Sequence, residues 1–270
     1  MSVFQSLILG IIQGITEWIP VSSKTQVSFV YLKVFHGDPS LAIPILLYVH
    51  LGTVIAAIIY FRKELVSIVK ETARKPLDLR SHASGKTGFL FTALLFTGII
   101  GIPLLVAERK FFPALNASLL YALMGAGLLI TGMLLFTHKK DNVREIQGVS
   151  WKDGVLTGIL QGFAVLPGIS RSGTSATGLI WRGFDSESSF YLSFLLSIPT
   201  VVLAEIILDY GINGATGVPV TDIAVLILTS LVVGYLTLDG LLRLLKRVNI
   251  AYLVVVLGIL IIAIGISGIG

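Results

Sequence analysis

The sequence contains no cysteine, and only 13% of its 270 residues are charged. The absence of cysteine excludes disulfide bonds and metal sites built from thiolates. The scarcity of charge, beside 54% apolar residues, excludes a soluble globular protein. The chain is therefore expected to be an integral membrane protein with no soluble domain of useful size. No nucleic-acid partner is expected, because the net charge of +5 in such a protein reports orientation first.

Six apolar stretches are long enough to cross a bilayer, whose core of about 30 Å requires about 20 residues of helix. They cover residues 41–61, 88–107, 115–136, 186–210, 220–242 and 250–269. The sequence therefore predicts an all-α polytopic membrane protein with six full transmembrane helices. A further apolar run at residues 3–19 lacks the basic start and the cleavage site of a signal peptide, so we expect it in the mature protein.

Basic residues concentrate in alternate connections between the stretches. Residues 62–86 contain seven Lys or Arg and residues 137–153 contain four, whereas residues 211–219 contain none. Positively charged connections favour the cytoplasmic side of a membrane. The pattern predicts a multi-pass protein of the cell (plasma) membrane with both termini outside, and an amphipathic cytoplasmic surface at residues 62–86.

An internal repeat relates the two halves of the chain. The segment GIIQGITEWIPVSSKT (residues 10–25) resembles GILQGFAVLPGISRS (residues 158–172). The offset is 148 before the prolines and 147 after them, and the second offset also aligns residues 50–53 with residues 197–200. An offset that holds over a polar tip and over the following span indicates duplication.

Each repeat is predicted to contain a polar-tipped apolar hairpin followed by three spans. Residues 1–136 form the first repeat and residues 150–270 the second, within a single membrane domain. The downstream limb of the first hairpin, residues 25–35, would be about 17 Å long and too short to cross the bilayer. We therefore expect two re-entrant helical hairpins. With three spans per repeat, the second repeat starts on the opposite side, which defines an inverted-topology repeat whose tips meet near the midplane.

The two hairpin tips carry groups suited to an anion. An intramembrane arginine such as Arg171 is costly unless it faces water or an anion, and its paired donors match phosphate oxygens. The second tip surrounds it with Ser170, Ser172, Thr174 and Gly168. The first tip supplies Ser22, Ser23, Lys24 and Thr25. The sequence predicts one phosphate-binding site where the tips converge.

Glu17 breaks the symmetry of the repeat, because the matching place in the second half is Ala164 or Val165. Packing alone would not require a carboxylate on one side only, so Glu17 is a candidate metal ligand or proton acceptor. Gln13 lies one helical turn away on the same face, and the two side chains could share a cation.

The serines of the first tip are candidates for covalent chemistry. Ser22 or Ser23 lies beside Glu17 and opposite Arg171. A hydroxyl between a base and a phosphate-binding group resembles an activated nucleophile for in-line attack on phosphorus.

The motifs QGITEWIPVSS and PGISRSG resemble those of the undecaprenyl-pyrophosphate phosphatase family of the bacitracin-resistance type. Members of that family show a Gln/Glu-x-x-x-Glu, a Pro-Val-Ser-Ser and a Pro-Gly-x-Ser-Arg-Ser element, and the resemblance runs over essentially the whole chain. It implies a hydrolase that removes the terminal phosphate of a polyprenyl pyrophosphate and regenerates the monophosphate carrier lipid. It also implies a divalent cation, Mg or Ca, and it leaves a homodimer as a candidate assembly.

The resemblance also implies roles for individual residues. The acidic pair of the family falls on Gln13 and Glu17, and its proposed nucleophile falls on Ser23. Its phosphate-binding arginine falls on Arg171, with Ser170 and Ser172 beside it.

Gln26 departs from the family pattern. Many members continue Thr-Gly-His or Ser-Gly-His after Pro-Val-Ser-Ser, whereas this chain reads Lys24-Thr25-Gln26. Glutamine can hydrogen-bond a phosphate but cannot exchange a proton near neutral pH. His50, in the middle of its span, is the other intramembrane imidazole and is either a general acid or base or a packing histidine. The variant suggests an archaeal-type member.

Other interpretations stay open at this point. The tips can be simple helix kinks, and Arg171 can be a structural counter-ion of Glu17. The function can also be that of a transporter or flippase of polyprenyl phosphate or another anion, because a midplane site in an inverted repeat suits alternating access. Glu17 and the serine pair favour chemistry, since a carrier needs no nucleophile. Trp151 and Trp181 are expected as interfacial anchors.

Overall fold

Apolar helices make up most of the computed structural model, which describes residues 1–74, 85–111, 117–137, 143–209, 217–247 and 249–267. The helices of the first half are α1 (Val3–Thr16), α2 (Ser23–Phe29), α3 (Ala42–Tyr60), α4 (Arg62–Arg74), α6 (Gly85–Phe111) and α7 (Ala117–Phe136). The helices of the second half are α8 (Trp151–Gly162), α9 (Arg171–Trp181), α10 (Ser186–Asp209), α11 (Val220–Arg247) and α12 (Ala251–Ser267). Among the described residues, β structure is limited to one isolated bridge between Arg144 and Phe184. The predicted all-α class is confirmed.

Five of these helices are long and apolar enough to cross a membrane, namely α3, α6, α7, α10 and α11. They coincide with five of the six predicted stretches, so the prediction of a polytopic membrane protein is confirmed. The sixth stretch, residues 250–269, contains α12, which is apolar but only 17 residues long. Residues 268 and 269 of that stretch lie outside the described part of the chain. The described residues thus hold five long spans where the sequence predicts six.

A pair of short helices precedes the long helices in each half. In the first half α1 leads to α2, which a π-helical turn at Val30–Val34 extends. In the second half α8, with 12 residues, leads to α9, with 11. All of these limbs are shorter than the roughly 20 residues that a bilayer crossing requires. The segment 25–35 is thus a short helical limb, as its length predicts.

The two helical pairs begin with the same local signal. The Ser2 hydroxyl accepts the backbone N–H of Gln5, whose side chain accepts the N–H of Ser2. Ser150 and Asp153 form the corresponding capping box at the start of α8. A capping box satisfies backbone donors that hydrocarbon cannot. The sequence therefore sets where both pairs start.

The first short helix of each half packs against a long helix of the other half. Helix α1 lies against α11, and α8 lies against α6. Gly10 and Gly14 face α11, and Gly158 and Gly162 face α6, so closely that a Cβ atom at any of them would collide. Small residues let membrane helices approach to backbone contact. The glycines of the repeated motif therefore join the two halves.

The chain turns through left-handed backbone at both tips. Gly168 has φ 81°, which glycine adopts easily, and a Cβ there would meet the backbone of Met124. Ser22 has φ 57°, which is uncommon for a residue with a side chain. Such a conformation persists only where the surrounding fold holds it. Ser22 lies directly before α2, so the turn fixes the direction of that helix.

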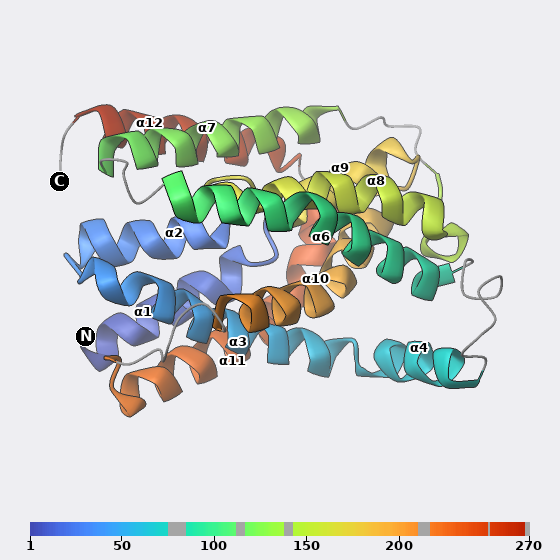
Figure 1. The fold of residues 1–270 in the computed structure, drawn as a ribbon, viewed down its shortest axis with the longest axis horizontal. Helices are drawn as coiled ribbons and strands as arrows, with labels where there is room; N and C mark the ends of the chain where they lie inside the picture. The colour runs from blue at the N-terminus through green and yellow to red at the C-terminus, as the bar shows by residue number, and fades with distance from the viewer. Residues whose placement is uncertain (75–84, 112–116, 138–142, 210–216, 248, 268–270) are drawn as a thin grey trace.

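The two ends of the molecule differ in charge. Helix α1 begins and α12 ends at the left of Figure 1, whereas α4 lies at the right. Helix α4 carries four basic residues and exposes Val66 and Val69, which agrees with the amphipathic surface predicted at residues 62–86. Residues 75–84 of that segment lie outside the described residues. The described basic segment and the start of the chain thus lie at opposite ends.

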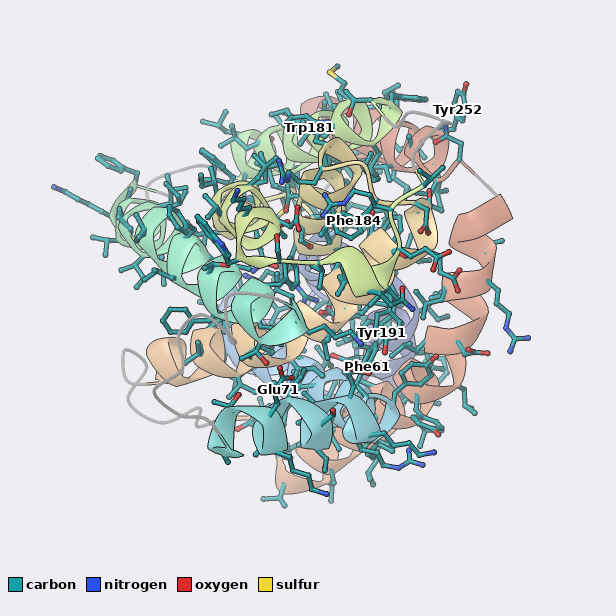
Figure 2. All side chains as sticks on the ribbon, turned by 90° about the vertical axis from the view of Figure 1, so that its right-hand side faces the viewer. Phe61, Glu71, Trp181, Phe184, Tyr191 and Tyr252 are labelled. Carbon is teal, nitrogen blue, oxygen red and sulfur yellow. The ribbon has the colours of Figure 1, made fainter. Side chains whose placement is uncertain are left out.

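Aromatic residues cluster at the end that carries α4, which faces the viewer in Figure 2. The rings of Phe61 and Tyr191 meet edge to face with centroids 5.0 Å apart. Trp181 and Trp151 are 46% and 42% exposed, as interfacial anchors must be, and the Nε1–H of Trp181 donates to Thr137. Their role at a membrane surface stays a prediction.

Asp153 ties the start of α8 to two connections. Its carboxylate accepts hydrogen bonds from both Nη atoms of Arg144, at 3.1 Å each, and from Nε of Arg182 at 2.8 Å. The Ser150 hydroxyl donates to it at 3.0 Å. The guanidinium of Arg144 also covers the ring of Phe184, 4.1 Å from its centroid. This buried ionic cluster lies apart from the residues of the candidate site.

Candidate active site

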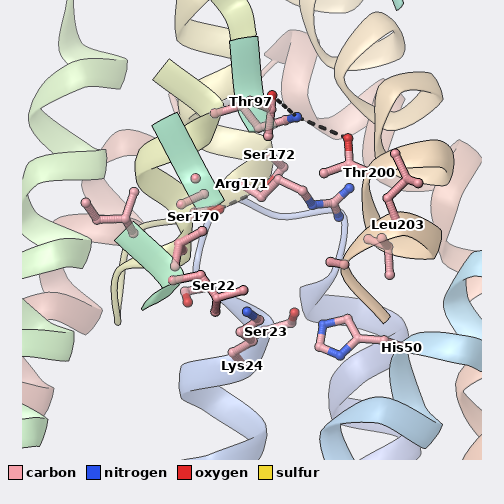
Figure 3. Close-up of a pocket in the computed structure, with 18 of the residues that line it drawn as sticks. Ser22, Ser23, Lys24, His50, Thr97, Ser170, Arg171, Ser172, Thr200 and Leu203 are labelled. Atoms are coloured by element: carbon pink, nitrogen blue, oxygen red, sulfur yellow. Dashed lines mark hydrogen bonds between the residues drawn. The ribbon is translucent and has the colours of Figure 1, made fainter. Parts of the chain in front are cut away.

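A cavity of about 420 Å³ opens where the two tips meet. Figure 3 shows Ser22, Ser23 and Lys24 of the first tip facing Ser170, Arg171 and Ser172 of the second, with His50 beside them. The cavity lies between α3, α6, α8 and α10, which supply the rest of its wall. The predicted convergence of the two tips is therefore present in the structure.

Glu17 is the centre of the polar contacts in the cavity. Its Oε2 accepts hydrogen bonds from Oγ of Ser23 at 2.6 Å and from Nε2 of Gln13 at 2.8 Å. Its Oε1 forms an ion pair with Nη2 of Arg171. Nε2 of His50 lies 3.5 Å from Oε2. Since Glu17 is only 6% exposed, these four groups compensate a charge that burial alone would not tolerate.

Arg171 is only partly satisfied by this ion pair. Its Nη2 meets Glu17, but its Nη1 is buried and has no hydrogen-bond partner among the described residues. Arg171 is also the first residue of α9, whose N-terminus adds positive potential at the tip. The counter-ion interpretation describes one half of the guanidinium, and the other half is left to bind an anion.

His50 lies within reach of Glu17 with a defined ring orientation. Its Nδ1 is 2.6 Å from the carbonyl oxygen of Leu46, one turn earlier in α3, and donates to it. The Nε2 atom then faces the carboxylate of Glu17. A ring held in this way can exchange a proton with Glu17 at the cavity wall.

The remaining tip residues divide into two groups. Ser22, Ser23, Lys24, Ser170 and Ser172 line the cavity with Glu17, His50 and Arg171. Gln13, Thr25, Gln26, Gly168 and Thr174 do not line it. The sequence pattern does not separate these groups, because both belong to the same short polar segments.

The second group makes contacts within the tips. The amide of Gln26 donates to the carbonyl of Val21 at 3.0 Å, and the hydroxyl of Thr25 donates to Ser22 at 3.1 Å. The hydroxyl of Thr174 donates to the carbonyl of Ser170, in the preceding turn. In this structure these side chains hold the shape of the tips and are not directed at a phosphate in the cavity.

Three further residues complete the polar wall and were not predicted as site residues. Gln161 donates through Nε2 to Oγ1 of Thr97 at 2.9 Å and to Oγ1 of Thr200 at 3.1 Å. All three line the cavity. The internal repeat aligns Gln161 with Gln13 and Thr200 with Thr53, which was a usable signal. Thr97 reaches the cavity only because α6 packs on α8, and no motif indicates it.

The rest of the wall is apolar. Most of it is formed by α6 and α10, and the tips add four further apolar residues. The residues of α6 and α10 are Leu94, Gly98, Gly101, Ile102, Leu105, Val201, Leu203 and Ala204, and those of the tips are Ile19, Ala164, Val165 and Ile169. The cavity therefore combines a charged end with a hydrocarbon-lined end, as an amphiphilic ligand would require.

The oxygen atoms beside Glu17 fit a hard divalent cation. Oε1 of Gln13 is buried without a hydrogen-bond partner in the described chain, and the Gln13 amide already contacts Glu17. No group of three or more His, Cys, Asp or Glu that could hold a metal occurs in the residues described. In this structure Gln13 meets Glu17 through Nε2 and not through Oε1, so the Glu17 carboxylate is the oxygen group placed for a cation. A carboxylate completed by phosphate oxygens of a ligand matches the way in which Mg²⁺ is usually held.

The family model described as "Bacitracin resistance protein BacA" matches residues 6–265 of this chain. The chain belongs to the BacA family. The match extends over both tips and over the cavity that they enclose, so the site described above lies within the region shared by BacA proteins. The resemblance carried by the two motifs is therefore confirmed.

Relatives of this BacA-family chain carry the name "Undecaprenyl-diphosphatase". The protein from Methanococcoides burtonii is 36% identical and aligns over 96% of this chain and 97% of its own length. The protein from Haloarcula marismortui is 36% identical over 90% of each chain, and that from Methanothrix thermoacetophila is 33% identical over 97% of each. These organisms are archaea, as the Lys-Thr-Gln variant suggests.

Proposed function

We propose that this protein is a polyprenyl diphosphate phosphatase of the undecaprenyl type, a membrane hydrolase that releases phosphate and regenerates the monophosphate carrier lipid. The observation that carries the proposal is the hydrogen bond of 2.6 Å from Ser23 to Glu17, at a cavity whose opposite tip presents Arg171. The names of the relatives favour hydrolysis over transport. The apolar wall of α6 and α10 suits the first isoprene units of the lipid.

The arrangement supports in-line attack by Ser23. Glu17 accepts the proton of the Ser23 hydroxyl as Oγ forms a bond to the terminal phosphorus, and the bond from that phosphorus to the bridging oxygen breaks. The lipid monophosphate leaves with the electron pair of the bridging oxygen. Water then attacks the phosphoserine and gives a proton to the same carboxylate. The bond from Oγ to phosphorus breaks, Oγ takes that proton back from Glu17, and inorganic phosphate is released with the Ser23 hydroxyl restored.

Arg171 and His50 support these steps in different ways. The unpaired Nη1 of Arg171 donates to an oxygen of the phosphoryl group, where negative charge is stabilised in the transition state. His50, whose Nε2 faces Glu17, returns the proton of that carboxylate to the leaving oxygen. The alternative mechanism is direct attack by water on the terminal phosphorus, with Glu17 as the base.

Glu17 and Gln13 are the residues that would hold a divalent cation, Mg or Ca. When bound, such a cation neutralises the charge on the diphosphate oxygens.

We further propose an inverted-topology repeat with α12 as the sixth span and with α1–α2 and α8–α9 as re-entrant hairpins. The support is the exchanged packing of α1 on α11 and of α8 on α6, which relates residues 1–136 to residues 150–270. The basic helix α4 lies at the end opposite the start of α1, which supports both termini outside the cell membrane. Cysteines placed singly at Gln5 and Lys70 should react from opposite sides in right-side-out vesicles; labelling from one side would contradict this topology.

Release of phosphate from a defined polyprenyl diphosphate tests the proposed activity directly. The purified protein in detergent should release one phosphate per lipid, and the product should be the monophosphate. Glu17→Gln, with the thermal stability of the variant measured in parallel, should reduce the rate by roughly 10²- to 10⁴-fold. A folded parent protein that binds the lipid but releases no phosphate would overturn the proposal.

A further inference from the structure

Gln161 places an unsatisfied acceptor in the cavity wall. Its side chain is 2% exposed, and its Nε2 uses both protons on Thr97 and Thr200. Its Oε1 is buried and has no hydrogen-bond partner in the part of the chain that the structure describes. A buried amide oxygen without a partner costs free energy, so a ligand is expected to satisfy it.

The two threonines fix the orientation of the Gln161 amide. The hydroxyl of Thr200 donates to the carbonyl of Leu196 at 2.8 Å, and that of Thr97 donates to the carbonyl of Gly158 at 3.3 Å. Each threonine oxygen therefore offers only lone pairs to Gln161. Turning the amide around would set its oxygen against two acceptors. The oxygen Oε1 is consequently the atom of this amide that keeps unused hydrogen-bonding capacity.

The same cavity contains an unsatisfied donor, Nη1 of Arg171. Figure 3 shows the guanidinium of Arg171 extending toward the side of the cavity on which Thr200 lies. A ligand that meets both unsatisfied groups must accept one hydrogen bond and donate another. A metal cation would satisfy Gln161 but would face the charge of Arg171. The other charged or titratable groups of the wall, Glu17, Lys24 and His50, lie around the first tip.

We propose that Gln161 and Arg171 together recognise a phosphate group that carries at least one P–OH proton. A phosphoryl oxygen accepts from Nη1 of Arg171, and the P–OH group donates to Oε1 of Gln161. A fully ionised phosphate or a sulfate has only acceptors, so one of its oxygens would be forced against the amide oxygen. Gln161 is thus a specificity-determining residue for the proposed function, on which this inference rests, and it applies to the terminal phosphate of the lipid and to released phosphate alike.

Discrimination between phosphate and sulfate tests the inference without any measurement of turnover. Inorganic phosphate near pH 6.5 and sulfate, at matched ionic strength, are titrated against the purified protein while the thermal unfolding midpoint is followed. Phosphate should raise the midpoint of the parent protein at concentrations about tenfold below those that sulfate requires. Gln161→Met, which keeps the side-chain length and removes the acceptor, should bind phosphate about tenfold more weakly and lose the preference.

Thr157→Val is the matched control. Thr157 lies one turn before Gln161 in α8, its hydroxyl is also buried without a partner in the described residues, and it does not line the cavity. This variant should keep the phosphate preference of the parent.

A double variant, Thr97→Val with Thr200→Val, covers the case in which Gln161→Met does not fold. It removes the two acceptors that orient the amide, so the amide can present N–H to the cavity, and sulfate binding should strengthen. A phosphate preference that survives Gln161→Met, or that is unchanged in the double variant, would overturn the inference even if the protein hydrolyses polyprenyl diphosphate. Absence of hydrolysis in a parent protein that still prefers phosphate would instead overturn the proposed function.

Discussion

The two hairpin tips share a scaffold and differ in their charged groups. In the first tip the amide of Gln13 contacts Thr53 at 3.4 Å, and in the second the amide of Gln161 contacts Thr200 at 3.1 Å. Both glutamines keep an amide oxygen without a partner among the described residues. A glutamine on the short helix is thus held by a threonine on the following long helix in each half.

The charges on this shared scaffold are complementary. The first tip carries Glu17 with Ser23 hydrogen-bonded to it, and the second carries Arg171 at the first turn of α9. Glu17 is buried and Arg171 is partly buried, and the two charges compensate each other across the cavity. Neither tip would be stable or useful alone, because an unpaired charge at this depth costs several kcal/mol. The cavity therefore has a carboxylate on one side and a guanidinium on the other, which suits the proposed base and the proposed anion-binding group.

The two tips are expected to differ most in how much activity is lost when a serine is replaced by alanine. Ser23→Ala should lower kcat by roughly 10³-fold or more while leaving lipid binding almost intact, because it removes the attacking oxygen. Ser172→Ala, in the opposite tip, removes only a hydroxyl that bonds Ser170 and the Ile19 carbonyl and should cost about tenfold or less. Both rates are measured by phosphate release. If Ser23→Ala retained a substantial rate and Glu17→Gln did not, water would be the nucleophile.

The second largest difference is expected when the basic residue of each tip is replaced by the other basic residue type. Arg171→Lys keeps the charge but replaces the paired, planar donor nitrogens of guanidinium by a single ammonium nitrogen, so it should raise the activation free energy by about 2 to 4 kcal/mol. Lys24→Arg in the first tip should change the rate far less, because Lys24 is exposed and is not among the four groups described above that contact Glu17. Steady-state kinetics of both variants checks this, and a fully active Arg171→Lys protein would assign Arg171 to structure.

Proton transfer in the first tip should depend on His50 and not on residue 26. His50→Ala should reduce kcat by about 10²-fold, the low end for a proton-transfer group, because Glu17 loses the ring beside it. Gln26→His, which restores the common family residue, should leave the rate close to that of the parent protein, since this side chain bonds the Val21 carbonyl outside the cavity. A clear gain of rate in Gln26→His would show that the imidazole reaches the substrate after all.

The smallest effect on activity is expected for Asp153, at the start of the second hairpin, because its charge acts on the stability of the fold. Burial raises the pKa of Asp153, but hydrogen bonds from Arg144, Arg182 and Ser150 outweigh burial and hold the pKa below its ordinary value. A carboxyl whose pKa is lower in the folded than in the unfolded chain stabilises the fold above the unfolded pKa of about 3.9 and loses this effect as the pH falls through the folded pKa.

Asp153→Asn should therefore lower the unfolding midpoint by several degrees at pH 7, with a difference from the parent that shrinks below about pH 4. Gln5→Ala, in the neutral capping box of the first hairpin, should instead give a small loss that does not depend on pH. Thermal unfolding from pH 3 to pH 7 compares the two variants, and a constant difference for Asp153→Asn would contradict the ionic role.

The long helices, the two tips and the central site residues could be predicted from patterns in the sequence. Apolar length predicts the long helices, since a bilayer sets the number of residues that a span needs, and the motif at residues 10–25 repeated at 158–172 identifies both tips. Glu17, Ser23 and Arg171 were predicted as site residues because buried charges and paired hydroxyls are costly in hydrocarbon unless they serve a ligand.

What only the tertiary structure decided is which polar atoms of the tips face the cavity and which are used up in holding their shape. Gln26 and Thr174 turn back onto nearby backbone, whereas Gln161 and Thr97, from helices far apart in the chain, meet because α8 packs on α6. Sequence spacing orders residues along a helix, but the side of a buried helix that meets a cavity depends on how neighbouring helices pack. The balance of one unsatisfied donor and one unsatisfied acceptor in the cavity is therefore a property of the packed bundle and not of either motif.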